Sequence, residues 1–195
     1  MLINRVKLYE LLSFNEAIQK NLGFKYPIYY LKKSHCYGIK KDNRFIAGFI
    51  LQSEINEFRV LNQISPIDRF TVFKRIIQNN RYKNLREYTG YFIEKGTNGF
   101  LFTFLMILIA IKNGSNFIYS FDISNNKLSK YYAPGKPLVV YRGKVKYDIE
   151  NDHCKTEYKS GIEQIEVCTQ IGIIRILISR TIRKVLKWIK QIFQR

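Results

Sequence analysis

The chain has 195 residues, which is enough for one ordinary globular domain but few for two. Hydrophobic residues make up 46% of it and aromatic residues 15%, and this composition excludes an intrinsically disordered polypeptide. The 33 Lys and Arg residues outnumber the 15 Asp and Glu residues and leave a formal net charge of +18. A charge of this size favours a polyanionic partner: nucleic acid, an anionic membrane surface or an acidic carrier protein.

Hydrophobic periodicity and turn residues divide most of the chain into alternating helices and strands. In chain order we expect a helix over 13–21, strands over 35–40 and 44–52 joined as a hairpin, a helix over 66–78, a strand over 85–95, an apolar helix over 100–112, a strand over 117–122, a short helix over 124–132 and a strand over 138–145. This order predicts one mixed α/β domain, built in layers, over residues 1–145.

Two segments follow this domain and differ from it in charge. Residues 146–171 hold a large share of the acids and predict an acidic edge strand or a loose connection. Residues 172–195 contain seven cations and no acid. On a helix, Trp188 and Phe193 flank one apolar face formed by Ile174, Ile178, Ile182, Val185, Ile189 and Ile192. This pattern predicts a cationic amphipathic helix, which either binds an anionic bilayer or docks on the domain with its charges in solvent.

The cysteines indicate neither a disulfide framework nor a metal site. Cys36, Cys154 and Cys168 have unrelated spacings. The dipeptide His35-Cys36 is repeated as His153-Cys154, but adjacent residues on a strand point to opposite faces, so each pair could offer only one ligand to a common metal. We therefore expect no metal.

Neither a signal peptide nor a membrane span is indicated by the sequence. Residues 1–20 mix charged and apolar residues without a hydrophobic core segment. The longest charge-free apolar stretch, 100–111, is too short to cross a bilayer and suits a buried helix. We expect a cytoplasmic protein, peripheral on the inner face of the membrane if residues 172–195 bind lipid.

A glycine-containing turn between the expected strand 85–95 and the apolar helix is a candidate anion site. Backbone N–H groups at a helix N-terminus lack intrahelical partners, and the helix dipole adds partial positive charge there. The Gly-Lys-Ser/Thr ending of a nucleotide-binding P-loop is absent from this turn. A simple strand-to-helix turn is the alternative interpretation.

With the order of elements, this turn resembles that of the GNAT acyltransferases over about residues 34–145. The family's turn has the pattern Arg/Gln-x-x-Gly-x-Gly/Ala, and here Asn98 and Phe100 stand where glycines are expected. The resemblance implies a mixed, mostly antiparallel central sheet flanked by helices. It also implies that acyl-CoA would be bound by the turn residues Lys95, Gly96, Thr97, Asn98, Gly99 and Phe100.

A second resemblance concerns the expected strand before this turn. Its residues 87–93 are similar to the Glu-x-Ser-Arg-Phe-x-Val strand of acyl-homoserine-lactone synthases and long-chain N-acyl amino acid synthases, with Gly90 in place of the arginine. Those GNAT-like enzymes take acyl chains from acyl carrier protein, which implies a long acyl chain and an acidic partner. The resemblance makes Glu87 the expected general base, with Glu94 as its competitor. A surface ion pair is the commoner role of a strand carboxylate.

A third resemblance covers residues 125–135, which are similar to the family's Asn-x-x-Ala-x-x-x-Tyr helix. It implies that Tyr132 protonates the departing thiolate and that Asn125 belongs to the acyl-CoA site. In the alternative, one of Tyr131 and Tyr132 packs in the core and the other meets solvent. The thioester carbonyl would be held by the expected strand 85–95, if a bulge separates that strand from its neighbour. The donors would be the backbone N–H groups of Phe92, Ile93 and Glu94.

The sequence thus predicts an acyltransferase that moves an acyl group, long-chain before acetyl, from acyl-CoA or the acyl-phosphopantetheine of a carrier protein to an amine. The rival hypothesis is a non-catalytic basic α/β module that binds an anionic membrane or RNA. Nucleic acid is the less favoured partner, because the aromatic residues occur in strands with core-like patterns and not in an RNA-binding motif.

Overall fold

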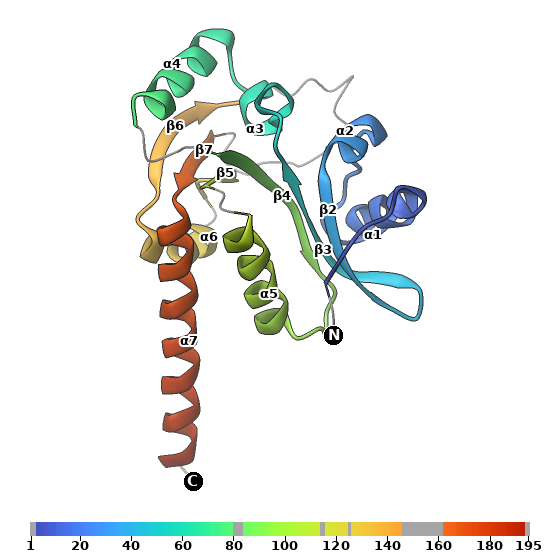
Figure 1. Ribbon diagram of the computed structural model, residues 1–195. Helices are drawn as coiled ribbons and strands as arrows, with labels where there is room; N and C mark the ends of the chain where they lie inside the picture. Colours follow the sequence, from blue (N-terminus) through green and yellow to red (C-terminus); the bar gives the residue numbers. More distant parts are fainter. Residues whose placement is uncertain (1–2, 80–83, 114–115, 125, 146–161, 194–195) are drawn as a thin grey trace.

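A computed structural model of the chain describes residues 3–79, 84–113, 116–124, 126–145 and 162–193. One sheet of seven strands, in the order β1-β2-β3-β4-β5-β7-β6, forms its centre (Figure 1). The strands are β1 (Asn4–Arg5), β2 (His35–Lys41), β3 (Arg44–Gln52), β4 (Leu85–Ile93), β5 (Asn116–Asp122), β6 (Leu138–Lys144) and β7 (Ile162–Cys168). β4 and β5 are parallel and all other neighbours are antiparallel, which confirms the predicted mixed, mostly antiparallel sheet.

Helices cover both faces of the sheet. The first face carries α1 (Leu11–Leu22), α2 (Ile28–Lys33), α3 (Arg59–Asn62) and α4 (Pro66–Ile77), with the short 3-10 helices η1 (Leu8–Glu10) and η2 (Ile55–Glu57) in the connections. The second face carries α5 (Gly99–Lys112), α6 (Asn126–Tyr132) and α7 (Gln170–Phe193), with η4 (Ala133–Gly135) after α6. Buried Phe92 of β4 faces the first set of helices, and buried Phe102 of α5 packs on the second face.

The strand β7 departs from the prediction. It falls in the segment predicted as an acidic edge strand or connection, but it pairs with both β5 and β6 and lies inside the sheet. Its acids Glu163 and Glu166 are buried, and the Tyr119 hydroxyl donates to Glu166 Oε2 at 2.8 Å. The predicted C-terminal helix begins at Gln170 and not at 172. Residues 146–161, which carry the other acids of that segment, lie outside the described part of the chain.

A bulge in β4 separates the end of that strand from β5. Gly48 of β3 lies opposite Phe92 and Ile50 opposite Thr89, so the two residues Gly90 and Tyr91 oppose one residue of β3. The parallel pairing of β4 with β5 covers only Leu85 to Glu87 of β4, and beyond it no described residues of the two strands pair. The structure thus contains the bulge that was assumed for the backbone donors at Phe92, Ile93 and Glu94.

The bulge explains why glycine occupies position 90. Gly90 has a φ of +62°, which side-chain-bearing residues adopt only with strain. A Cβ atom at this position would lie 2.8 Å from Ile50 Cδ1 and 3.3 Å from Tyr26 Cε2. A larger side chain here would require the Ile50 and Tyr26 side chains to shift.

Replacing Gly90 with alanine is expected to lower the free energy of unfolding by about 2–4 kcal/mol, from left-handed backbone strain and overpacking against Ile50. Gly23→Ala is the matched control, because Gly23 also has a positive φ, +84°, but no described atom lies within 4 Å of its would-be Cβ. In urea unfolding, the free energy of unfolding of this control should fall by about 1 kcal/mol. Equal losses in the two variants would contradict the packing part of this explanation.

Candidate active site

A pocket opens on the second face of the sheet where β4 and β5 diverge. It holds about 480 Å³ of atom-free space, part of it open to solvent. Tyr88 and Tyr119, the first residues of β4 and β5 beyond the last parallel pair, both line it. The other lining residues are Phe49, Leu51, Met106, Ile107, Phe117, Tyr131, Tyr132, Cys168, Ile173 and Ile176. Apart from tyrosine hydroxyls and one thiol this lining is apolar, which suits a hydrocarbon chain.

Tyr132 lines this pocket, and its hydroxyl has no hydrogen-bond partner among the described residues. Its ring stacks on Tyr119 with 4.2 Å between ring centroids. Burial raises its pKa well above the usual value for tyrosine, so the phenol stays protonated at physiological pH. By contrast, Arg180 Nη1 donates to the neighbouring Tyr131 hydroxyl at 2.6 Å. The structure therefore distinguishes the two tyrosines: both line the pocket, but only Tyr132 keeps an available proton.

A polar network beside the pocket connects β4, α5, α6 and α7. Thr103 Oγ1 donates to the Gly99 carbonyl at 2.7 Å, so the 2.9 Å contact between the Tyr91 and Thr103 hydroxyls has Tyr91 as donor. Tyr131 also hydrogen-bonds Thr103. The Arg180 guanidinium lies 4.3 Å from the Tyr131 ring centroid. No pattern in the sequence indicated this network, since Arg180 resembled the other cations of its helix.

One of the three expected backbone donors points toward the gap between the strands. The Glu94 N–H donates to the Ile46 carbonyl of β3 at 2.7 Å, and Phe92 is in register with Gly48 of the same strand. Because N–H groups alternate in direction along a strand, the Ile93 N–H points away from β3, toward the space where β5 has diverged. Of the three N–H groups, only that of Ile93 is directed toward the gap.

The predicted phosphate turn lies at the same end of the gap. The Thr97 N–H donates to the Glu94 carbonyl at 3.1 Å and closes a turn through exposed Lys95 and Gly96, whose φ is +91°. Gly99 begins α5, and a Cβ there would lie 3.4 Å from Ile93 Cδ1.

Asn98 and Phe100, which replace the family's glycines, occupy the start of α5. Asn98 is the N-cap, and its Oδ1 accepts the Leu101 N–H at 3.1 Å. Phe100 lies half-buried in the first turn. The asparagine thus has a structural reason to be there. Asn125, the other predicted acyl-CoA contact, lies outside the described residues.

Glu87 has the environment of a structural carboxylate. It is fully buried on the first face, opposite the pocket, and accepts from Tyr30 Oη at 2.8 Å and from the Arg59 and Val60 N–H groups, each at 2.9 Å. Burial raises its pKa, against the opposing effect of these three donors. Glu87 therefore holds the N-terminus of α3. Its predicted role as general base is not supported by this geometry.

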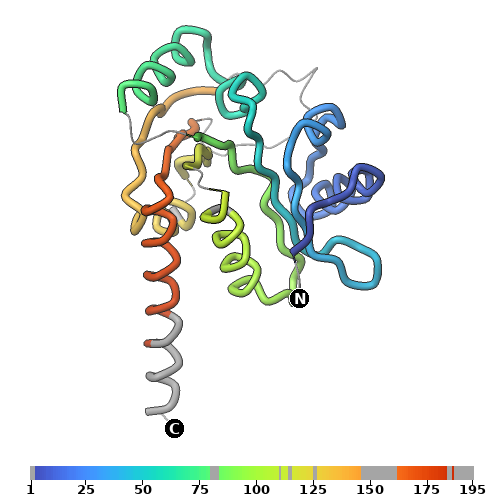
Figure 2. Tube along the Cα trace, viewed as in Figure 1, coloured from blue at the N-terminus to red at the C-terminus, as the bar shows by residue number. Residues whose placement is uncertain are grey.

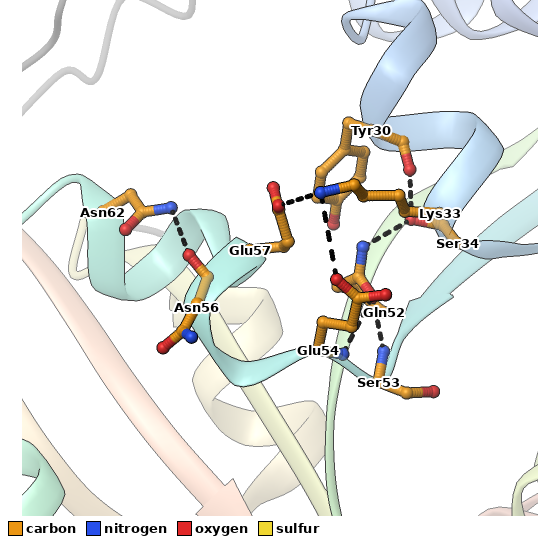
Figure 3. A network of polar contacts seen from close by, with 9 residues as sticks. All are labelled: Tyr30, Lys33, Ser34, Gln52, Ser53, Glu54, Asn56, Glu57 and Asn62. Atoms are coloured by element: carbon orange, nitrogen blue, oxygen red, sulfur yellow. Dashed lines mark hydrogen bonds and ion pairs between the residues drawn. The ribbon is translucent and has the colours of Figure 1, made fainter.

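Further polar contacts hold the surroundings of Glu87 in place (Figure 3). Gln52, which lies opposite Glu87 in register, is fully buried and donates to Ser34 Oγ at 3.1 Å. Ser34 Oγ donates in turn to the Tyr30 carbonyl at 2.7 Å. At the surface of this cluster, Lys33 pairs with Glu57 at 2.5 Å.

Glu94, the other candidate for the general base, forms ion pairs with two cations. Lys20 Nζ lies 2.7 Å from its Oε1, and Arg44 Nη2 lies 3.4 Å from its Oε2. The hydrogen bond from Lys20 is the main reason that the pKa of Glu94 is lowered. A carboxylate with a lowered pKa is a weak base, so Glu94 is a poor replacement for Glu87.

Two further features of the described residues bear on function. No three His, Cys, Asp or Glu side chains among them gather as a metal site requires; His153 and Cys154 lie outside this part of the chain. Within the same ranges, none of the helices combines the length and apolar character needed to cross a bilayer.

Replacing Glu87 with glutamine is expected to lower the free energy of unfolding by about 1–3 kcal/mol, because one N–H at the start of α3 loses its acceptor. Since the folded-state pKa of Glu87 is raised above 4.5, the folded protein binds more protons than the unfolded chain in the window above 4.5. The wild type therefore loses stability relative to the variant as pH rises through that window.

Urea unfolding of both proteins at acidic and neutral pH measures this difference. Glu57→Gln, at an exposed pair, is the control and should change stability by about 0.5 kcal/mol or less. A Glu87→Gln variant that kept full stability but lost acyl transfer would instead restore Glu87 as the base.

The comparisons with known proteins bear on the fold. No protein-family model and no curated protein matches the sequence. Among solved structures, FeeM, an N-acyl amino acid synthase from uncultured soil microbes, aligns with a TM-score of 0.55 at 10% identity over 87% of this chain and 95% of its own.

Two further solved structures align equally well at 10% identity, each over 86% of this chain. The ribosomal-protein-S18-alanine N-acetyltransferase of Escherichia coli matches with a TM-score of 0.54 over 92% of its length. Arabidopsis thaliana NAA60 in complex with a bisubstrate analogue matches with a TM-score of 0.54 over 98% of its length. At such identities the likeness establishes the fold alone. The chain has the GNAT acyltransferase fold, as its sequence motifs predicted.

Proposed function

We propose that this protein is an N-acyltransferase that takes a long acyl chain from a thioester, acyl-CoA or acyl carrier protein, and transfers it to an amine. The apolar pocket at the divergence of β4 and β5 is the observation that carries the proposal. Its walls are aliphatic and aromatic, and hydrocarbon burial contributes about 0.8 kcal/mol per methylene. The high positive charge of the chain suits either an acidic carrier protein or the phosphates of CoA.

The same geometry suggests what each group does. The acyl chain would fill the pocket, and the thioester carbonyl would accept a hydrogen bond from the Ile93 N–H. The phosphate of the donor would bind the turn formed by residues 95–100. The amine attacks the carbonyl carbon, the carbon–sulfur bond breaks, and Tyr132 gives its proton to the leaving thiolate. No carboxylate lines the pocket among the described residues, so the amine's proton passes to solvent and the phenol is reprotonated from there.

Tyr132→Phe is expected to lower kcat about a hundredfold by removing the acid, while leaving the melting temperature unchanged because no described hydrogen bond is lost. Release of free thiol from an acyl-CoA in the presence of amines measures the rate. Tyr131→Phe is the control: it removes the partner of Arg180 and should lower the melting temperature more than it lowers kcat. The opposite pattern would transfer the role of acid to Tyr131.

Narrowing the pocket with Ile173→Phe is expected to weaken binding of long-chain acyl-CoA about tenfold, and to leave binding of CoA unchanged. Ile171→Phe is the matched control. Ile171 lies two positions earlier on α7, is 64% exposed and does not line the pocket. Titration calorimetry across a chain-length series measures both variants. Equal affinity of wild type and Ile173→Phe for every chain length would place the acyl chain elsewhere.

A non-catalytic module that uses its basic surface to bind a membrane or RNA is the competing function. It requires no thioester site, so it predicts no thiol release from any donor, an acyl carrier protein included. The Tyr132 phenol, which lies beside an apolar pocket and has no hydrogen-bond partner among the described residues, favours the enzyme over this module.

A further inference from the structure

The helix α7 has two apolar faces, and only one of them is covered. Its inner face buries Ile173 and Ile176 against the domain, and Arg180 reaches Tyr131 of α6 from the same side. Its outer face carries large apolar side chains that remain in solvent, with exposed fractions of 64% for Ile171, 52% for Ile178, 53% for Ile182 and 53% for Leu186. The four recur at intervals of seven, four and four residues, which places them in one row along the helix.

Among the described side chains of α7, none beyond Arg180 is covered. Figure 1 shows α7 at the margin of the molecule, extending away from the end of the sheet, and Figure 2 shows the first half of the helix at the same margin. Beyond Arg180 the side chains that the structure describes, Thr181, Ile182, Arg183 and Leu186, are all exposed. Most helical stability in proteins comes from packing of an apolar face. This row of exposed aliphatic side chains therefore lacks a partner within the described part of the chain.

The charge of the segment restricts what that partner can be. From Gln170 to Arg195 the sequence has seven cations and no acid: Arg175, Arg180, Arg183, Lys184, Lys187, Lys190 and Arg195. A second copy of the helix would bring like charges together, and nucleic acid would leave the aliphatic row uncovered. An anionic bilayer satisfies both features, because its headgroups attract the cations and its acyl region takes the apolar row.

We propose that the outer face of α7, defined by Ile171, Ile178, Ile182 and Leu186, docks the protein on an anionic lipid bilayer. The helix lies along the surface with this row in the acyl boundary and its cations among the headgroups. The proposal stands independently of the proposed acyl transfer. The two sites share one helix, because Ile173 and Ile176 on the inner face of α7 line the pocket.

A second exposed apolar patch, on α4, provides a matched control. Ile67 and Ile77 there are 80% and 73% exposed, so they are no less accessible than Ile178 and Ile182. That helix also carries Asp68, and its charges are mixed. If exposed apolar side chains alone determined binding to the bilayer, α4 would bind it as well as α7 does.

Sedimentation of the full chain with vesicles tests the proposal. Wild type should bind vesicles of equal parts phosphatidylcholine and phosphatidylglycerol, bind pure phosphatidylcholine far less, and lose affinity as salt is added. The double variant Ile178→Ser/Ile182→Ser should bind the anionic vesicles at least about tenfold more weakly, while Ile67→Ser/Ile77→Ser should match wild type. Both double variants change exposed side chains, so melting temperatures near wild type verify folding.

The chain's single tryptophan, Trp188, lies within α7 and gives a second readout. Its emission should shift to the blue on addition of anionic vesicles, since indole settles at the membrane interface. Equal vesicle binding by wild type and the α7 variant, or equal loss in the α4 variant, would overturn the proposal. So would tight RNA binding with no vesicle binding, which would identify nucleic acid as the polyanion.

Discussion

The early end of the parallel pairing between β4 and β5 is the constraint on which the candidate site depends. The two strands share pairs only up to Glu87 and Ile118, and the bulge at Gly90 then turns the rest of β4 away. Two features of the site follow from this divergence. Tyr88 and Tyr119 face a pocket where a continued sheet would have packed against helices, and the Ile93 N–H meets a gap where it would have met a carbonyl of β5.

Two departures from the family's motifs have local physical causes. Gly90 stands where the similar synthase strand has an arginine, and here the bulge has a positive φ and a Cβ would crowd the Ile50 and Tyr26 side chains. Asn98 replaces a glycine because its side chain caps α5. A side-chain oxygen that accepts the Leu101 N–H leaves fewer free donors for an anion at this turn. In the proposed thioester site, the apolar pocket would therefore contribute to donor binding beside this turn.

Local sequence patterns predicted the order of elements well, because hairpins, helix starts and turns depend on residues that are adjacent in the sequence. Asp42 and Asn43, placed in the hairpin turn, both adopt positive φ as such turns require. Interactions between distant residues were less predictable. The place of β7 inside the sheet depends on pairing with β5 and β6, and the role of Glu87 depends on α2 and α3, which lie elsewhere in the chain. No spacing rule could have brought Arg180 to Tyr131, 49 residues away.

The central claim, that the divergence of β4 and β5 holds an acyl thioester, is tested most directly by thermal unfolding of the wild type at fixed moderate salt. The ligands are CoA, acetyl-CoA, acyl-CoAs of increasing length and an acylated carrier protein. A ligand that binds the folded state raises the melting temperature. We expect a shift that grows with chain length and persists when salt is added, since apolar burial is not screened. No shift with any thioester, the carrier protein included, would contradict the account.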